Sequence, residues 1–202
     1  MIIIGITGPT GAGKTTALNE LTKLGGATID CDAVYHELLE GDIALQNALE
    51  QRFGDLQDGS GHIDRKKLGA IVFQDQAALA ELNAIAHRAV VRKVGELIEV
   101  YRAAGTYTAI AVDAISLFES GLADLCQETL AITAPPEIRV RRIMAREGIS
   151  EDYARARVKA QNPDEFYTSR CDHTLVNDCD SAADFAARAH ALFELILQTD
   201  IH

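Results

Sequence analysis

The residues best suited to chemistry lie near the start of the chain, at positions 8–15. Their sequence, Gly-Pro-Thr-Gly-Ala-Gly-Lys-Thr, fits the pattern G-x-x-x-x-G-K-[ST], in which glycines let consecutive backbone N–H groups turn toward phosphate oxygens. A chance glycine-rich turn is the competing interpretation, but a β-branched run precedes the loop and a helical pattern follows it, as the motif requires. The loop therefore predicts binding of a nucleoside triphosphate, with ATP as the default. The residues expected to hold it are Gly8, Gly11, Ala12, Gly13, Lys14, Thr15 and Thr16.

Two side chains at the end of this loop predict magnesium-dependent phosphate chemistry. Lys14 should reach the β- and γ-phosphates, and the Thr15 hydroxyl should bind Mg²⁺. Asp113 follows an apolar run at residues 106–112 and is a candidate for a carboxylate that assists Mg²⁺ binding. Capping of a helix is the structural alternative for Asp113.

An acidic pair, Asp30 and Asp32, lies at the end of the second expected strand. Because the carboxyl ends of parallel strands face the ligand crevice, both side chains should lie beside the phosphates. Either carboxylate could accept a hydrogen bond from a substrate hydroxyl and orient it for attack. The structural alternative is that one of them caps the helix that begins near Ala33. Asp32 is the preferred candidate for catalysis.

An arginine-rich segment follows the fourth expected strand. Arg139, Arg142 and Arg146 recur at i, i+3 and i+7 and therefore share one helix face. Residues 139–170 contain eight basic and five acidic side chains, in a chain whose formal net charge is -11. A solvated charged surface is the plain alternative. Beside a phosphate loop, the pattern favours a lid whose Arg142 and Arg146 close over phosphates as catalytic residues.

Composition argues against several classes of protein. The negative net charge and the absence of Trp disfavour nucleic-acid binding. The sequence has neither the guanine-reading NKxD nor the LSGGQ signature of ABC proteins. Four cysteines without a C-x-x-C pair are typical of a reduced cytoplasmic protein. The apolar runs are shorter than the roughly 20 residues of a membrane span. We therefore expect a cytoplasmic protein with no signal peptide and no membrane or nucleic-acid partner, either a monomer or a small homo-oligomer.

The elements that must position these residues alternate between strand and helix. Strands are expected at residues 1–6, 27–29, 106–112, 128–134 and 173–176, and a final helix after Ser181. Such alternation predicts an α/β fold with a parallel sheet covered on both faces. The long helical stretch at residues 33–101 is too large for a simple crossover, so it predicts a substrate-binding insertion.

Over almost its whole length the chain resembles the dephospho-CoA kinase family. Residues 5–16 are similar to the family's G-x-T-G-G-x-G-S-G-K-S-T, and residues 30–32 to its D-A-D. Further matches are residues 59–68 to D-G-x-I-D-R-x-x-L, 116–119 to L-L-F-E, 139–146 to Q-x-x-R-x-x-x-R, 157–161 to R-x-x-x-Q, and 171–177 to A-D-x-x-I-x-N. The chain departs from the family at Arg88 (Pro), at Ala114-Ile115-Ser116 (V-P-L) and at Arg139 (Gln).

The resemblance implies ATP-dependent phosphorylation of the ribose 3′-hydroxyl of dephospho-CoA, on a P-loop kinase fold with a five-stranded parallel sheet. It implies a nucleotide-binding core of residues 1–32, 106–138 and 171–202, an acceptor-binding helical subdomain of residues 33–105, and a lid of residues 139–170. Asp32 would orient the hydroxyl, and Asn177 would contribute to nucleotide binding. The acceptor contacts are expected from Asp32, His87, Glu119, Arg139 and Gln161.

Two other functions stay open on the sequence. One is a P-loop kinase that phosphorylates a different small molecule, such as a nucleoside or nucleotide. The other is a regulatory ATP-binding protein without acceptor chemistry, against which Lys14, Thr15, Asp32 and the arginine stripe argue. His87 alone is more typical of a structural histidine than of a ligand-binding one.

Overall fold

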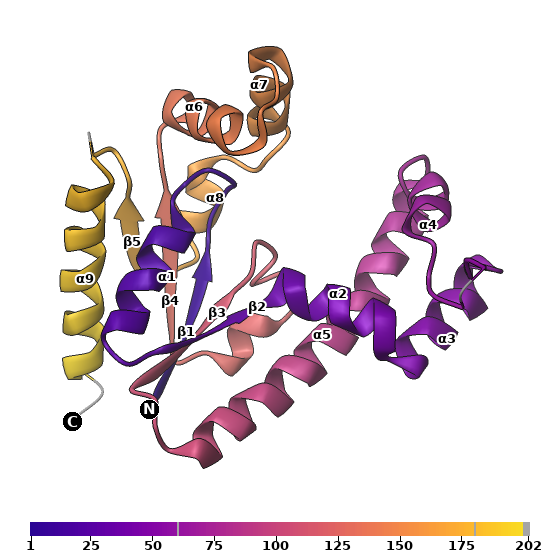
Figure 1. Cartoon of the computed structure of the whole chain (residues 1–202), viewed down its shortest axis with the longest axis horizontal. Helices are drawn as coiled ribbons and strands as arrows, with labels where there is room; N and C mark the ends of the chain where they lie inside the picture. Colours follow the sequence, from indigo (N-terminus) through magenta and orange to yellow (C-terminus); the bar gives the residue numbers. More distant parts are fainter. Residues whose placement is uncertain (60, 180, 200–202) are drawn as a thin grey trace.

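A five-stranded parallel sheet forms the centre of the protein. The computed structural model describes residues 1–59, 61–179 and 181–199. Residue 60 of the dephospho-CoA kinase-like segment at 59–68, and residues 180 and 200–202 of the predicted core segment 171–202, lie outside the described residues. The strands are β1 (Ile2–Thr7), β2 (Ala27–Asp30), β3 (Ala109–Asp113), β4 (Glu128–Thr133) and β5 (His173–Val176). Their order is β2-β3-β1-β4-β5, and neighbouring strands pair in parallel (Figure 1). The predicted fold class is confirmed.

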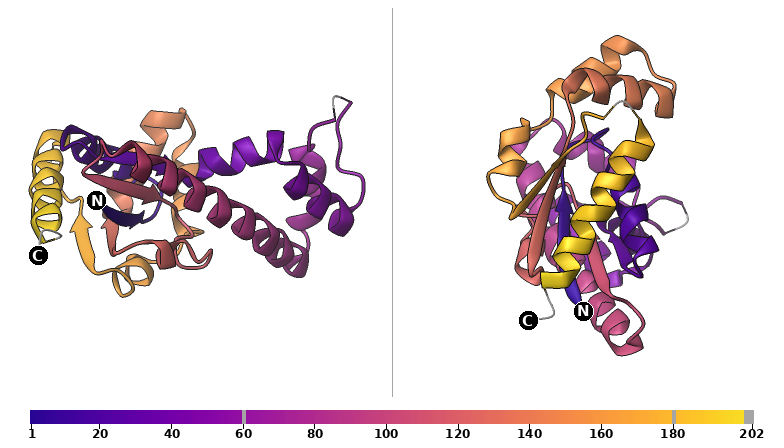
Figure 2. Two further views of the ribbon diagram at one scale, coloured as in Figure 1. Left: turned by 90° about the horizontal axis from the view of Figure 1, so that it is seen from below. Right: turned by 90° about the vertical axis from the view of Figure 1, so that its left-hand side faces the viewer.

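The two faces of the sheet bury different sets of side chains, because successive residues of a strand point to opposite faces. Ile2, Ile4 and Ile6 of β1 pack with α1 (Lys14–Lys23) and α9 (Ala182–Thr199). Figure 2 shows these two helices together on one face. Ile3 of β1 and Ile110 of β3 instead join the core that faces the helical insertion. The phosphate loop thus leads from a strand buried on both faces into a helix fixed by α9.

The helical insertion extends away from the sheet beyond β2 (Figures 1 and 2). It consists of α2 (Cys31–Gly41), α3 (Ile43–Phe53), α4 (Arg65–Val72) and the long α5 (Gln76–Ala104). Each begins after an aspartate whose carboxylate accepts N–H bonds of the first turn, as expected for an N-cap. These caps are Asp30, Asp42, Asp64 and Asp75. α5 packs against α2, α3 and α4 and also contacts β2 and β3, so it joins the insertion to the sheet.

Three helices separate β4 from β5. They are α6 (Pro136–Glu147), α7 (Glu151–Lys159) and α8 (Asp164–Thr168). α6 and α7 pack on each other around Val140, Ile143 and Ala154, which form a small core of their own above the sheet. A short 3₁₀ turn, Leu122–Leu125, lies between β3 and β4.

The main difference from the predicted elements is the start of the third strand. It begins at Ala109 rather than at residue 106. α5 ends at Gly105, whose φ of 64° only glycine adopts readily, and Thr108 then bonds the carbonyl oxygens of Gly25 and Leu24. Three residues are therefore used to turn the chain back onto the sheet. In the described part of the chain, no helix is both long and apolar enough to span a bilayer.

Asp172 joins β4 to the start of β5 through a set of short hydrogen bonds. Its carboxylate accepts bonds from the Thr129 backbone N–H at 2.9 Å and the Thr129 hydroxyl at 2.6 Å, and its own N–H donates to that hydroxyl oxygen at 3.0 Å. The hydroxyl bond is the main reason that the pKa of Asp172 lies below its ordinary value.

We expect Asp172→Ala to lower the free energy of unfolding at pH 7 by about 1.5–3 kcal/mol, the range for hydrogen bonds to a charged group. Because the folded pKa is depressed, this stability is present above the unfolded carboxyl pKa of about 3.9 and is lost as the pH falls through the lower folded value. Urea unfolding at a series of pH values measures this. Asp178→Ala, which removes an exposed ion pair with Arg188, is the control. Equal losses in both variants, or a loss independent of pH, would contradict the prediction.

Candidate active site

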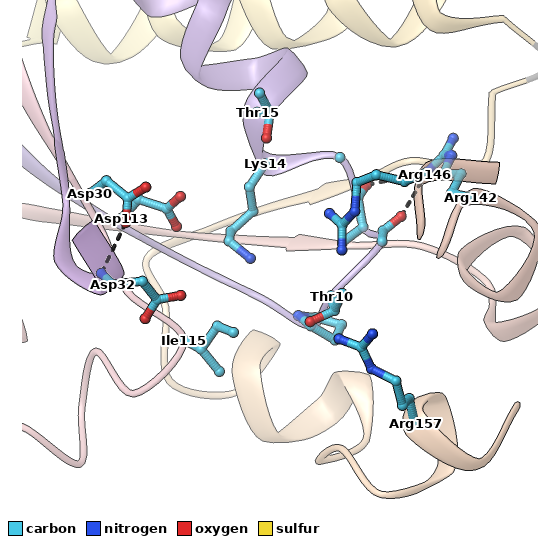
Figure 3. A pocket seen from close by; sticks show the side chains of 14 residues that line it. Thr10, Lys14, Thr15, Asp30, Asp32, Asp113, Ile115, Arg142, Arg146 and Arg157 are labelled. Atoms are coloured by element: carbon cyan, nitrogen blue, oxygen red, sulfur yellow. Dashed lines mark hydrogen bonds between the residues drawn. The ribbon is translucent and has the colours of Figure 1, made fainter. Parts of the chain in front are cut away.

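A cavity of about 530 Å³ lies where β1, β2 and β3 end. Its walls come from the phosphate loop, from the acidic ends of β2 and β3, and from α6 and α7 (Figure 3). The lining residues are Pro9, Thr10, Gly11, Ala12, Gly13, Lys14, Thr15, Asp30, Asp32, Asp113, Ile115, Arg142, Arg146 and Arg157. Segments far apart in the sequence therefore meet at the carboxyl edge of the sheet, where ligands bind in open α/β folds.

The loop adopts a conformation that requires glycine. Gly8, Gly11 and Gly13 have φ values of 140°, 82° and 108°, and non-glycine residues adopt such values only with strain. Space is restricted as well. A Cβ on Gly8 would lie 2.0 Å from the Ile132 carbonyl oxygen, and one on Gly11 would lie 3.0 Å from the Arg139 carbonyl oxygen. The loop is packed directly on β4 and α6.

The carbonyl oxygens of the loop are bonded to the protein. Lys14 Nζ donates to Gly8 at 3.0 Å, and Arg139 Nε donates to Thr10 at 3.0 Å. Arg142 Nη1 donates to Gly11 at 3.2 Å and to Ala12 at 3.4 Å, and Asn177 Nδ2 donates to Ala12 at 2.9 Å. Gly13, as the N-cap of α1, offers no side chain to the first N–H groups of that helix. Those groups, at the positive end of the helix, are suited to bind an anion.

Lys14 lies between groups of opposite charge. Figure 3 shows its amino group with the three aspartates on one side and Arg146 and Arg157 on the other. Burial is the largest cause of a lowered pKa for Lys14; Asp113 and Asp32 oppose this effect, and Arg146 adds to it. Burial likewise raises the pKa of Asp113 to about 6, with Lys14 acting in the other direction. The cavity therefore holds both cations for phosphate and carboxylates for a metal or a hydroxyl.

The two aspartates at the junction of β2 and α2 have different tasks. Asp30 caps α2, and its Oδ1 accepts bonds from the N–H groups of Asp32 at 2.9 Å and Ala33 at 3.0 Å. Asp32, in the first turn of α2, extends its carboxylate into the cavity (Figure 3). The alternatives left by the sequence are thus separated by the structure: Asp30 is the cap, and Asp32 is not. Asp113 lines the cavity and does not cap a described helix.

Two further cavities adjoin the first. One of about 190 Å³ shares Asp32 and Ile115 with it and is also lined by His87, Ser116 and part of α5. Burial lowers the pKa of His87, while the nearby Glu119 raises it. The other, of about 350 Å³, shares Arg142 and lies between α6 and Cys179. The central cavity therefore shares lining residues with both neighbouring cavities.

Comparison with known proteins identifies the family of this chain. The model of the family described as dephospho-CoA kinase matches residues 2–183. The chain belongs to the dephospho-CoA kinase family. A dephospho-CoA kinase of Corynebacterium diphtheriae is 36% identical over 178 residues, which are 88% of each chain. The solved dephospho-CoA kinase of Campylobacter jejuni is 26% identical, with a TM-score of 0.71 over 98% of both chains.

A more distant structure shows the fold alone. The shikimate kinase of Bacteroides thetaiotaomicron is 15% identical, with a TM-score of 0.52 over 96% of this chain and 98% of its own. Membership of the dephospho-CoA kinase family makes the chain an ATP-dependent kinase, a transferase.

Several predicted site residues of this dephospho-CoA kinase family member lie outside the central cavity. Arg139 and Asn177 are each 3% exposed and donate hydrogen bonds to carbonyl oxygens of the loop. Gln161 bonds Thr10. Gly8 and Thr16 shape the loop through their contacts with Lys14 and Gly13, and Glu119 pairs with Arg170 at 2.6 Å. His87 lines the adjacent cavity.

Sequence reasoning missed four residues that line the cavity, namely Pro9, Thr10, Ile115 and Arg157; Pro9, like Thr10, is one of the unspecified positions of the loop motif. The sequence contained an indication for Arg157, because this residue begins the R-x-x-x-Q segment that resembles the family. It and Arg146 both pair with Glu147. Ile115 lies in the segment that departs from the family, and Thr10 has an ordinary x position in the loop motif.

We expect Gly11→Ala to weaken nucleotide binding, because the left-handed backbone costs a non-glycine residue about 1–2 kcal/mol, a factor of about 5–30 in an equilibrium constant. The methyl group would also push against the backbone of Arg139. Isothermal calorimetry with ADP measures the effect.

Gly95→Ala is the matched control, because Gly95 lies within α5 with no atom within 4 Å of its added Cβ. It should keep the affinity and stabilise the helix by about 0.5–1 kcal/mol. Wild-type affinity in Gly11→Ala would contradict the requirement for glycine.

Proposed function

We propose that this chain transfers the γ-phosphoryl group of ATP to the ribose 3′-hydroxyl of dephospho-CoA, giving CoA and ADP. The observation that carries the proposal is that the central cavity shares Arg142 with one neighbouring cavity and Asp32 with another. The central one is lined by the phosphate loop, the one that shares Arg142 is assigned to the nucleotide base, and the one that shares Asp32 is assigned to the part of the acceptor that carries the reacting hydroxyl. Asp32 and Ile115 line both the phosphate cavity and the acceptor cavity. Phosphoryl transfer requires such a shared wall, because the two substrates must meet there.

Nucleotide binding is assigned to the loop and to α6. The backbone N–H groups at the start of α1 would bind the β- and γ-phosphates, and Lys14 would exchange its bond with Gly8 for phosphate oxygens. Arg142 contacts both the phosphate cavity and the cavity assigned to the base. Asn177 fixes Arg142 through a bond of 2.9 Å to Nη2, so its contribution to nucleotide binding is indirect.

The residues around Lys14 fit a magnesium ion. The Thr15 hydroxyl and the Asp113 carboxylate line the same cavity, and such oxygen ligands, together with phosphate and water, are what Mg²⁺ prefers. In the described residues no cluster of three His, Cys, Asp or Glu side chains forms a separate metal site. When bound, Mg²⁺ would neutralise charge on the β- and γ-phosphates.

The acceptor hydroxyl would be oriented by Asp32. Because transfer of a phosphoryl group passes through a loose transition state, the main task of this carboxylate is to accept the hydroxyl hydrogen bond and direct the oxygen at the γ-phosphorus. His87 lies across the same acceptor cavity. Arg146 and Arg157 would turn from Glu147 to the transferring phosphoryl group and neutralise its charge.

These roles support the predicted division into three parts. Residues 33–105 would bind the acceptor, because Tyr35, Leu82 and Val90 line its cavity. Residues 139–170 would act as a lid, because they carry the three arginines of the central cavity. Residues 1–32, 106–138 and 171–202 would form the nucleotide-binding core, in which Asp32 and the segment 114–116 also face the acceptor cavity.

The acceptor is tested with a panel. The segment 114–116, which departs from the family, lines the acceptor cavity, so the choice of acceptor is the point to measure. ADP release with Mg²⁺ and ATP should be fastest, by kcat/KM, with dephospho-CoA rather than with AMP, uridine or adenosine. A faster reaction with any other acceptor would replace the proposed substrate, and ATP binding without transfer to any acceptor would favour a regulatory protein.

Asp32→Asn should lower kcat by about 10²–10⁴-fold, the usual contribution of a positioned acid–base group, and leave the KM for ATP nearly unchanged. Asp30→Asn is the matched control, because it retains an oxygen that can cap α2 and does not orient the hydroxyl. Steady-state kinetics, with the concentrations of ATP and of the acceptor varied, measure kcat and KM for both variants. If Asp30→Asn is the more damaging change, the roles are reversed.

A further inference from the structure

Arg139 is almost fully buried, yet it does not line the phosphate cavity. Its side chain is 4% exposed and its Nε donates to the carbonyl oxygen of Thr10 at 3.0 Å. Its Nη2 donates to Oε1 of Gln161, and its Nη1 lies 3.7 Å from a carboxylate oxygen of Asp164. Burial of a guanidinium is costly unless its donors are used, so these bonds indicate a fixed position.

Gln161 contacts the same loop residue from another direction. Its Nε2 donates to the Thr10 hydroxyl at 2.8 Å, and its Oε1 accepts the Thr10 N–H at 3.2 Å. Arg139 and Gln161 together therefore bond the N–H, the carbonyl and the hydroxyl of Thr10. Every polar group of Thr10 thus has a hydrogen-bond partner.

The two residues lie at the two ends of the α6–α7 pair. Arg139 lies in the first turn of α6, and Gln161 follows α7, three residues before Asp164 begins α8. The loop also packs on the backbone of Arg139, which a Cβ on Gly11 would approach to 3.0 Å. Both chain connections between the sheet and the α6–α7 pair thus meet at Thr10.

We propose that Arg139 and Gln161 are positioning residues that fix Thr10, and through it the phosphate loop, to the base of the α6–α7 pair. They act on nucleotide binding through the loop and do not contact the acceptor. The proposal rests on the proposed function only in taking ATP as the nucleotide.

The test uses Arg139→Met, Gln161→Leu and the double variant. Methionine keeps an unbranched side chain but has no donors and no charge, so no unpaired charge is buried. The Kd for ADP, measured by calorimetry with Mg²⁺ and no acceptor, should rise at least about tenfold in each single variant. Because both residues act on Thr10, the double variant should be no more than about twofold worse than the worse single variant.

Kinetics separate positioning from loss of structure. The KM for ATP should rise with the Kd for ADP, while the KM for the acceptor should stay within about twofold, since its cavity is built from other elements. If the two residues only stabilised the fold, the variants would have a kcat lowered in proportion to the folded fraction, and both KM values would stay unchanged. Arg139→Lys should recover part of the affinity for ADP. Its ammonium group reaches Thr10, but it cannot bond Thr10 and Gln161 together as the planar guanidinium does.

Arg155→Met is the matched control. Arg155 lies on α7, and its guanidinium pairs with Glu137 and Glu151 within the α6–α7 pair rather than with the loop. It should bind ADP like the wild type. Three results would each overturn the proposal. They are wild-type ADP affinity in folded Arg139→Met, an equal rise of both KM values, and the same loss of ADP affinity in Arg155→Met. If Arg139→Met does not fold, wild-type ADP affinity in Gln161→Leu overturns it. ADP binding decides these outcomes even if dephospho-CoA proves not to be the acceptor.

Discussion

The structure depends on one constraint, which is that a single loop must present N–H groups to a cavity while its carbonyl oxygens are bonded elsewhere. Buried backbone oxygens without partners would cost more than the loop can recover from its own few bonds. Arg139, Arg142 and Asn177 supply the missing donors, and Lys14 covers Gly8. The position of α6 and the end of β5 follow from this requirement. Asn177 is itself placed by its N–H bond to Thr133 at 2.7 Å, which continues the β4–β5 ladder.

The charged groups around the loop are paired with one another. Asp113 and Asp32 face Lys14, and Glu147 pairs with both Arg146 and Arg157. A chain with a formal net charge of -11 therefore has four cationic side chains at one cavity, each with an anionic or carbonyl partner. Exchange of these partners for phosphate oxygens keeps the cations paired, so nucleotide binding need not leave a desolvated charge unpaired.

Local patterns predicted the parts of the site that are formed by neighbours in sequence. The loop motif located Lys14 and Thr15, and strand ends located Asp32 and Asp113, because both signals lie within a few residues. Helical spacing grouped Arg139 with Arg142 and Arg146 but could not show that the first turn of α6 lies beneath the loop. That contact joins residues 129 positions apart. Arg157 was missed for the same reason, since α7 returns toward the cavity only through its packing on α6. The start of β3 was misplaced because Thr108, a good strand residue, bonds Leu24 and Gly25 instead.

The spacing of Asp30 and Asp32 shows how one short segment serves both the fold and the chemistry. β2 must end and α2 must begin without a connecting loop, so the last strand residue has to cap the helix, and Asp30 does so. An N-cap leaves the second residue of the helix on the first turn, where its side chain is free to extend past the end of the sheet. Asp32 occupies that position and reaches the wall shared by two cavities. The cap therefore fixes the direction of α2 and, with it, the place of the carboxylate relative to Lys14. A one-residue shift of the cap would turn Asp32 by about 100° around the helix, away from the wall it shares with Ile115.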